Sequence, residues 1–238
     1  MPLPKISTPT YELEIPSTKK KIRYRPFLVK EEKILIIAME SQSDTEIANA
    51  VKDVLSTCIL TKDVKVDTLS TFDIEYLFLN IRGKSVGEDV EVLVTCPDDN
   101  KTKVPVRINL DDIKIITHND HKRDIKLDDS LLMRMRYPSI NEFIKSNFST
   151  SEVKSEDTFD LIISCIEQIY NDEESWSTSD CTKEEMNDFL DQLNSNQFKD
   201  IEKFFDTMPK LSHTLTVNNP NTKVKSDIKL EGLAAFFA

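Results

Sequence analysis

The chain has 238 residues, of which 39% are hydrophobic and 31% charged, and its net charge is −11 at neutral pH. This length suits one domain or two small ones, and the composition fits a folded, strongly solvated chain rather than a disordered one. The acidic balance argues against broad nucleic-acid binding, and no apolar run reaches the roughly 18 residues of a membrane span. The first residues contain two acids and no apolar core, so we do not expect a secretory signal.

The first 29 residues are rich in proline and in basic side chains. Because proline removes a backbone donor and fixes φ, residues 1–29 are expected to form an extended arm, with strand-like alternation at 11–15 and 22–24. Such an arm gains order by lying on its own domain or on a partner. Its basic side chains are candidates for partner binding: Lys19, Lys20, Lys21, Arg23 and Arg25.

Charge is distributed unevenly along the chain. Residues 142–206 contain 17 acids and only 5 bases, so most of the negative charge lies there. One interpretation is a solvated acidic surface beside a flexible basic leader. The other is assembly, in which the basic arm of one subunit meets an acidic surface on a neighbour.

Three helices are expected after the arm. The first, at 30–41, is apolar at most positions, which is typical of a buried helix. Ser43 and Glu46 form a capping-box pattern that starts the second helix. The third begins at Ser70 and runs to residues 82–85, since basic residues in the last turn and a following glycine suit a helix C-terminus.

The apolar period then changes from the helical value to alternation. Residues 90–94 and 104–110 alternate on either side of a polar turn, which predicts a β-hairpin. Further short strands are expected up to residue 137. A polar stretch at 149–158 predicts a boundary between two lobes.

The second lobe is expected to be mainly helical. Helices are predicted at 159–170, after a capping box at 182–185, and at 197–208, followed by a second hairpin over 215–230. The predicted fold is therefore α+β. Its expected parts are an arm at 1–29, a helical unit with a central β-hairpin region at 30–148, and a helical lobe closed by a C-terminal β-hairpin at 149–238.

Cysteine and histidine are poorly placed for metal binding or catalysis. The cysteines at 58, 96, 165 and 181 are scattered with no Cys-x-x-Cys pair, so neither a disulfide scaffold nor a complete zinc ribbon fits. The two hairpins share a sequence plan with each other, and their turns lie where zinc-ribbon knuckles carry Cys-Pro-x-Cys, yet only Cys96 supplies a thiol there. His118 and His121 are expected in a solvated loop. We therefore expect no metal, no cofactor, no catalytic residues and no enzymatic activity.

Two aromatic features have both a structural and a partner-binding interpretation. Phe236 and Phe237 lie side by side among small apolar residues at the C-terminus, and they dock either on their own lobe or on a neighbour. Trp176 lies alone in an acidic loop and is either a packed anchor or an interface residue. All three join the basic residues of the arm as candidate partner-binding residues.

Several motifs resemble one known family. The most specific is FDIEYLF at 72–78 with IRGKSVG at 81–87, and it is joined by the Pro-rich basic leader, KEEK at 30–33, and LEGL at 230–233 followed by Phe236 and Phe237. Together they are similar to the baseplate hub family of T-even-type contractile-tailed phages, over nearly the full length. The resemblance implies a hub subunit or hub-assembly factor, and it brings no catalytic residues to transfer.

The expected function is thus structural or assembly work in a phage tail baseplate hub, with other baseplate and hub proteins as partners. The expected location is the host cytoplasm during assembly, and the motifs leave open whether the mature virion retains the chain. Two alternatives belong to other classes. A nucleic-acid-binding module derived from a zinc ribbon requires a basic, zinc-bearing surface, and a cell-wall hydrolase requires paired carboxylates in a cleft.

Overall fold

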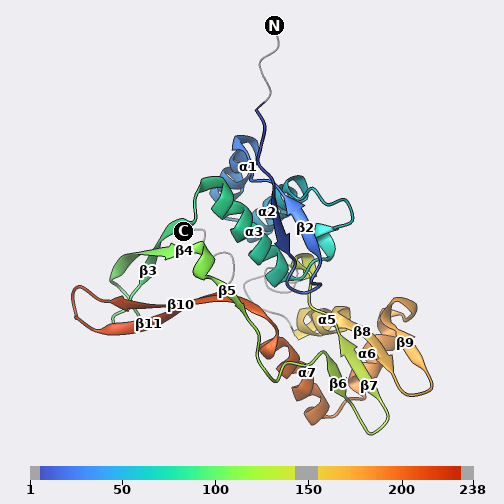
Figure 1. Ribbon diagram of the computed structural model, residues 1–238. Helices are drawn as coiled ribbons and strands as arrows, with labels where there is room; N and C mark the ends of the chain where they lie inside the picture. The colour runs from blue at the N-terminus through green and yellow to red at the C-terminus, as the bar shows by residue number, and fades with distance from the viewer. Residues whose placement is uncertain (1–5, 143–154, 232–238) are drawn as a thin grey trace. The chain divides into compact units, whose positions relative to one another are not determined.

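The structure, a computed structural model, describes residues 6–142 and 155–231 (Figure 1). Helices and small antiparallel sheets occur together in these residues, which confirms the predicted α+β fold. The chain divides into two compact units. Unit 1 comprises Met1–Ile116 and Lys210–Ala238, and unit 2 comprises Thr117–Pro209.

Unit 1 begins with a β-hairpin. β1 (Tyr11–Glu14) pairs antiparallel with β2 (Lys21–Tyr24), and β2 forms a further bridge to the chain after the second helix. Ile15, Ile22 and Tyr24 of the hairpin are buried. The basic segment expected as an extended arm is therefore folded against its own unit, because its alternating apolar side chains find a core there.

Three helices follow close to their predicted positions: α1 (Val29–Glu40), α2 (Asp44–Cys58) and α3 (Thr71–Val86). The Ser43 side chain accepts a hydrogen bond from the Glu46 N–H, and the Ser70 side chain accepts one from the Asp73 N–H. Both predicted N-caps are confirmed, since each serine satisfies a backbone donor in the first turn of its helix.

The third helix ends close to its predicted end at residues 82–85, because α3 stops at Val86. Gly83 lies inside α3, and Gly87, with φ of 118°, stands at the C-cap. A positive φ is strained for residues that carry a Cβ. The glycine that ends this helix is therefore Gly87.

Antiparallel strands complete unit 1. The predicted first hairpin is confirmed as β3 (Asp89–Thr95) paired with β4 (Lys103–Asn109). The second sheet contains β5 (Lys114–Ile116), β10 (Lys210–Asn218) and β11 (Lys225–Glu231), in the order β11-β10-β5. Inward-facing residues of these strands share one apolar core with Leu79 of α3.

Unit 2 packs helices on a four-stranded antiparallel sheet. The strands are β6 (Asp124–Lys126), β7 (Leu132–Met135), β8 (Ile166–Tyr170) and β9 (Ser175–Ser177), in that order across the sheet. The helices are α5 (Ser155–Cys165), α6 (Lys183–Asp191) and α7 (Ser195–Thr207). Met133, Cys165, Ile201 and Phe204 are fully or almost fully buried in its core.

The helix predicted over residues 159–170 ends earlier than expected. It ends at Cys165, and the chain continues directly as β8. In that strand Ile169 pairs with Met133 of β7, so the apolar residues that suggested a longer helix face the core from a strand instead.

The C-terminal hairpin lies in a different unit from the one expected. Within the proposed range 149–238 it would close the second lobe, but β10 pairs with β5, and Lys210 lies opposite Ile116. The two units meet in sequence at residues 116–117 and 209–210. Unit 2 is thus an insertion between two strands of the same sheet of unit 1.

Candidate functional site

Helix α1 exposes an unusually large share of its apolar side chains. Leu35 and Ala38 are buried, but large apolar side chains at the other positions are not. Residues 28–39 hold six of the fourteen exposed large hydrophobic side chains in the described part of the chain: Leu28, Val29, Ile34, Ile36, Ile37 and Met39. Ile37 is the extreme case together with Val29, at 66% exposure each.

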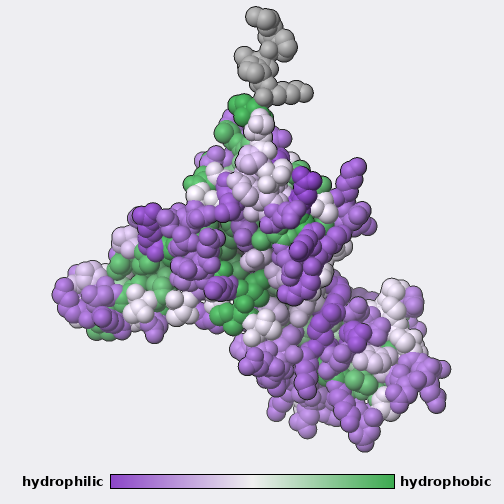
Figure 2. All heavy atoms as spheres, viewed as in Figure 1, coloured by the Kyte–Doolittle hydropathy of each residue, from purple (hydrophilic) through white to green (hydrophobic). Residues whose placement is uncertain are grey.

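A helix that is apolar on most sides is normally buried on most sides. In Figure 2, hydrophobic atoms appear among hydrophilic ones in the region where Figure 1 labels α1. Contiguous exposed apolar surface typically marks a protein–protein contact. We call the exposed side chains of residues 28–39 the α1 surface.

The first turn of α1 is fixed to unit 1 by a buried ion pair. Arg25 Nη2 donates to Glu31 Oε1 at 2.9 Å, and the Leu28 N–H donates to Glu31 Oε2 at 2.8 Å. Burial by itself raises the pKa of Glu31, but the hydrogen bonds from Arg25, Leu28 and Lys30 outweigh it and hold that pKa at about 2. The helix is therefore held firmly at one end while its outer side stays exposed.

Arg25 differs from the other basic residues predicted to bind a partner. Its side chain is only 14% exposed, and its guanidinium donates to Glu31 and to the Pro26 carbonyl and lies 3.8 Å from the Cys58 sulfur. The hydrogen bond to Glu31 raises the pKa of Arg25 further. In the structure this side chain therefore supports α1 from inside.

The remaining basic candidates lie on the exposed side of the hairpin. Lys19 is 3.9 Å from Glu14, Lys20 Nζ donates to the Asp63 carbonyl at 3.0 Å, and the Arg23 N–H donates to Thr61. Lys21 is also exposed. The structure thus places four exposed basic residues on one short hairpin: Lys19, Lys20, Lys21 and Arg23. In the sequence, this hairpin is far from the acidic residues of unit 2.

The aromatic candidates have separate positions. Trp176 lies in β9, at an edge of the sheet of unit 2, where it pairs with Ile169 and is 41% exposed. This strand edge leaves the indole partly available for a contact. Phe236 and Phe237 lie outside the described residues.

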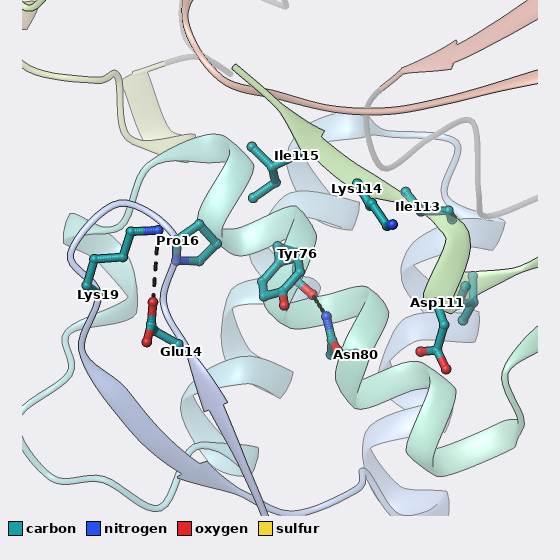
Figure 3. Close-up of a pocket in the computed structure, with 10 residues that line it drawn as sticks. Glu14, Pro16, Lys19, Tyr76, Asn80, Asp111, Ile113, Lys114 and Ile115 are labelled. Atoms are coloured by element: carbon teal, nitrogen blue, oxygen red, sulfur yellow. Dashed lines mark hydrogen bonds and ion pairs between the residues drawn. The ribbon is translucent and has the colours of Figure 1, made fainter. Parts of the chain in front are cut away.

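A groove of about 380 Å³ lies between the hairpin turn, α3 and the chain around β5 (Figure 3). Tyr76 and Asn80 line it from α3, and Asn80 Nδ2 donates to the Tyr76 carbonyl at 2.8 Å. On the hairpin side, Lys19 and Glu14 approach each other. Its lining mixes apolar side chains with charges of both signs, which suits a surface contact better than a reaction that needs converging acids or bases.

The turns of the two hairpins that share a sequence plan meet in the structure. Asn219 is buried, and its Nδ2 donates to both carboxylate oxygens of Asp98, at 3.1 and 3.0 Å, and to Asp99 at 3.0 Å. The Thr222 hydroxyl donates to Asp98 at 2.5 Å. Hydrogen bonds between polar side chains therefore join the two turns, which lie about 120 residues apart in sequence.

Three of the four cysteines have surroundings that raise the thiol pKa. Burial raises the pKa of Cys58 to about 11 and that of Cys165 to about 12. At Cys96, burial and then the negative charges of Asp98 and Asp99 raise the pKa as well. These three cysteines are therefore protonated at neutral pH and are poor nucleophiles.

His118 and His121 lie in a loop, as predicted, and His118 is exposed, but the side chain of His121 is half-buried rather than solvated. Its Nδ1 lies 3.0 Å from the Thr207 hydroxyl and its Nε2 lies 3.0 Å from the Tyr137 hydroxyl. The ring stacks against Tyr137, also lies against Phe204, and burial lowers its pKa. Both ring nitrogens have hydroxyl partners and the ring packs on aromatic side chains, so this histidine supports the core of unit 2.

The described residues offer neither a metal-binding cluster nor a membrane-spanning helix. Within 6–142 and 155–231, no group of three or more His, Cys, Asp or Glu side chains is arranged to hold a metal ion. Across the same residues no helix combines the length and the apolar character that crossing a bilayer requires.

The sequence analysis did not predict the hydrogen bonds that attach the β1–β2 hairpin to α3. Asp73 is fully buried and accepts hydrogen bonds from the Ser17 N–H at 2.9 Å and the Ser17 hydroxyl at 2.5 Å, besides the Ser70 hydroxyl. Asp73 was recognisable as part of a helix cap. Its partner Ser17 is 56 residues away, and no local pattern marks it.

The comparison with protein families gives one result that covers almost the whole chain. Residues 8–238 match the family described as T4 bacteriophage base plate protein. The chain belongs to this family and is a phage baseplate protein, which confirms the predicted resemblance at that level. No curated protein and no solved structure matches the chain. The family also implies that the chain contacts other baseplate proteins.

Proposed function

We propose that this baseplate protein is a non-enzymatic component of the hub of a contractile phage tail and that it acts through contacts with other subunits. The family match supports the baseplate assignment. The hub assignment rests on the motifs at 72–87 and at the C-terminus. Such a protein contributes shape and binding surface instead of a chemical step.

The observation that carries the proposal is the α1 surface. Six large apolar side chains at 28–39 stay exposed in a chain that buries comparable residues elsewhere. Covering them by another subunit removes apolar area from water, at roughly 25 cal/mol per Å². Association with a neighbour therefore stabilises this part of unit 1.

The basic hairpin and the aromatic candidates add further contacts in this proposal. Lys19, Lys20, Lys21 and Arg23 are exposed and suit an acidic surface on a neighbour, where charge complementarity guides association. Trp176 offers a partly exposed indole at a sheet edge. Phe236 and Phe237 remain proposed contact residues, and Arg25 contributes through its ion pair with Glu31.

The proposal is tested with a phage that lacks this chain and is supplied with variants. The double variant Ile36→Glu/Ile37→Glu places two charges on the α1 surface and should prevent formation of complete baseplates. Leu93→Glu is the matched control, because Leu93 is exposed to a similar degree in β3, outside this surface. Normal infectious particles from the α1 variant would exclude the proposed role of this surface.

Mass spectrometry of purified particles then separates the two forms of the proposal. A fixed, stoichiometric amount of the chain in every particle identifies a resident hub subunit of the virion. Its presence in assembly intermediates but absence from particles identifies an assembly factor acting in the host cytoplasm. Absence from both would contradict the proposed function.

A further inference from the structure

The outward side of α1 has a regular pattern of residue types. Four positions of the helix follow one another at spacings of four, three and four residues: Val29, Lys33, Ile36 and Glu40. Ile37 lies beside Ile36. At 3.6 residues per turn, these positions lie on one side of the helix. All five side chains are exposed.

The buried residues of α1 confirm which side points outward. Glu31, Leu35 and Ala38 are the buried ones, and they are displaced from this stripe by about half a turn. The 4-3-4 spacing is that of the contact positions of a helix that packs lengthwise against another helix. The stripe is therefore shaped for a helical partner.

The charges on the stripe identify that partner. Lys33 and Glu40 are opposite in sign, are seven residues apart, and flank Ile36 and Ile37 on either side. When a second α1 lies antiparallel across a twofold axis that passes between positions 36 and 37, Lys33 faces Glu40 of the other copy at both ends. A parallel arrangement would instead place like charges opposite each other.

We infer that the α1 surface binds the α1 surface of a second copy of this chain, antiparallel, with Ile36 and Ile37 packed against the same pair and two symmetric Lys33–Glu40 contacts. This inference deepens the proposed function and rests on it. Among the described residues, neither Lys33 nor Glu40 has an ion-pair partner within its own chain, so both charges are available. The surface is self-complementary, which is the requirement for a twofold contact.

The contact is small. A pair of short helices covers less than the roughly 1,200 Å² of a standard stable interface, so the dimer dissociates readily in dilute solution. Within a baseplate, other contacts hold the subunits near one another and raise their effective concentration. Its measurement therefore needs high protein concentration.

The test is charge exchange on the purified full chain, followed by sedimentation equilibrium over a range of concentrations. We expect the wild type to dimerise, and we expect Lys33→Glu and Glu40→Lys each to raise the dimer dissociation constant about tenfold or more, because each creates two like-charge contacts. An equimolar mixture of these two variants should form a heterodimer, and Lys33→Glu/Glu40→Lys in one chain should dimerise like the wild type.

Matched controls are available on another element of unit 1. Lys103→Glu and Glu91→Lys reverse exposed charges on the hairpin of β3 and β4 and should leave dimerisation unchanged. Circular dichroism checks that every variant is folded. The mixing experiment is also informative by itself, because each variant is the partner that rescues the other.

Three outcomes would overturn the inference. They are a wild type that stays monomeric at all concentrations, a dimer unaffected by either charge reversal, and a mixture that fails to form the heterodimer. The proposed function fails on a different result, namely normal particles assembled with Ile36→Glu/Ile37→Glu. A monomeric chain whose α1 variant still blocks assembly would show that another baseplate protein covers the surface.

Discussion

Helices α1 and α3 are both rich in apolar residues, and they differ in what covers them. VKEEKILIIAME and TFDIEYLFLNIRGKSV both place apolar residues around most of the helix. In α3, most of them are buried, among them Ile74, Leu77, Phe78 and Ile81. In α1, Leu35 and Ala38 are the only apolar residues that are buried.

The neighbours of each helix explain the difference. α3 is contacted by α2, by the segments around β5 and β10, and by the β1–β2 hairpin through Ser17 and Asp73. α1 packs chiefly on α2 and is tied at its first turn by Arg25 and Glu31. When a helix is apolar on all sides, its sequence indicates that it will be buried. The sequence does not say whether its own chain or a second chain buries it.

The largest expected loss of stability comes from a substitution in α3, the buried helix. Leu77→Ala should lower the free energy of unfolding by about 3 kcal/mol, because it removes a fully buried side chain and leaves a cavity. Ile37→Ala in α1 should change it by less than about 0.5 kcal/mol at low protein concentration. Urea unfolding followed by circular dichroism measures both. Similar losses from the two substitutions would mean that α1 is buried within its own chain.

The anchor of α1 predicts a somewhat smaller effect that depends on pH. Glu31→Gln should cost about 2 kcal/mol near pH 7, because Arg25 is left without its charged partner. The folded-state pKa of Glu31, about 2, lies below its ordinary value of 4.5, so the ion pair stabilises the fold above about pH 4.5 and is lost as the pH falls toward 2. The difference between wild type and variant should shrink over that window.

The control for this effect is Glu32→Gln, a neighbouring acid in the same first turn that does not bond to Arg25 among the described contacts. It should change stability little at any pH. A constant difference between wild type and Glu31→Gln from neutral pH down to pH 2 would contradict the role assigned to the Glu31 charge.

The contact between the β1–β2 hairpin and α3 is expected to contribute less to the free energy of unfolding than Leu77 or the Arg25–Glu31 ion pair. Ser17→Ala removes the hydroxyl that donates to Asp73 and should lower stability by about 1 kcal/mol. Thr18→Ala, one residue further along the exposed turn, is the matched control and should be close to neutral. Thermal unfolding of the two variants provides the comparison. Equal losses of stability in the two variants would show that the hydrogen bond to Asp73 does not hold the hairpin on α3.

Local signals in the sequence predicted the helix starts well. Ser43, Ser70 and Thr182 each cap a helix where predicted, because a capping side chain and the backbone donors that it satisfies lie within one turn. The alternating segments around both hairpins were also recognised correctly. These features need information from only a few neighbouring residues.

Contacts between distant residues were not predictable in the same way. The pairing of Lys210 with Ile116, which places the C-terminal hairpin in unit 1, depends on the whole of unit 2 returning the chain to that point. The α1 surface was missed for a related reason. Its apolar residues were interpreted as a buried helix, and a stripe exposed to solvent has the same composition as a stripe covered by the chain's own core.

The smallest effect on stability should accompany a clear change in surface properties. Ile36→Glu/Ile37→Glu should leave the unfolding free energy within about 0.5 kcal/mol, since both side chains are already exposed, yet it should reduce binding of a fluorescent hydrophobic dye. Leu93→Glu removes an exposed apolar side chain outside the α1 surface and should reduce dye binding less. If the two variants lowered dye fluorescence equally, the apolar side chains of α1 would act as scattered residues, and α1 would differ from α3 in burial without forming a binding surface.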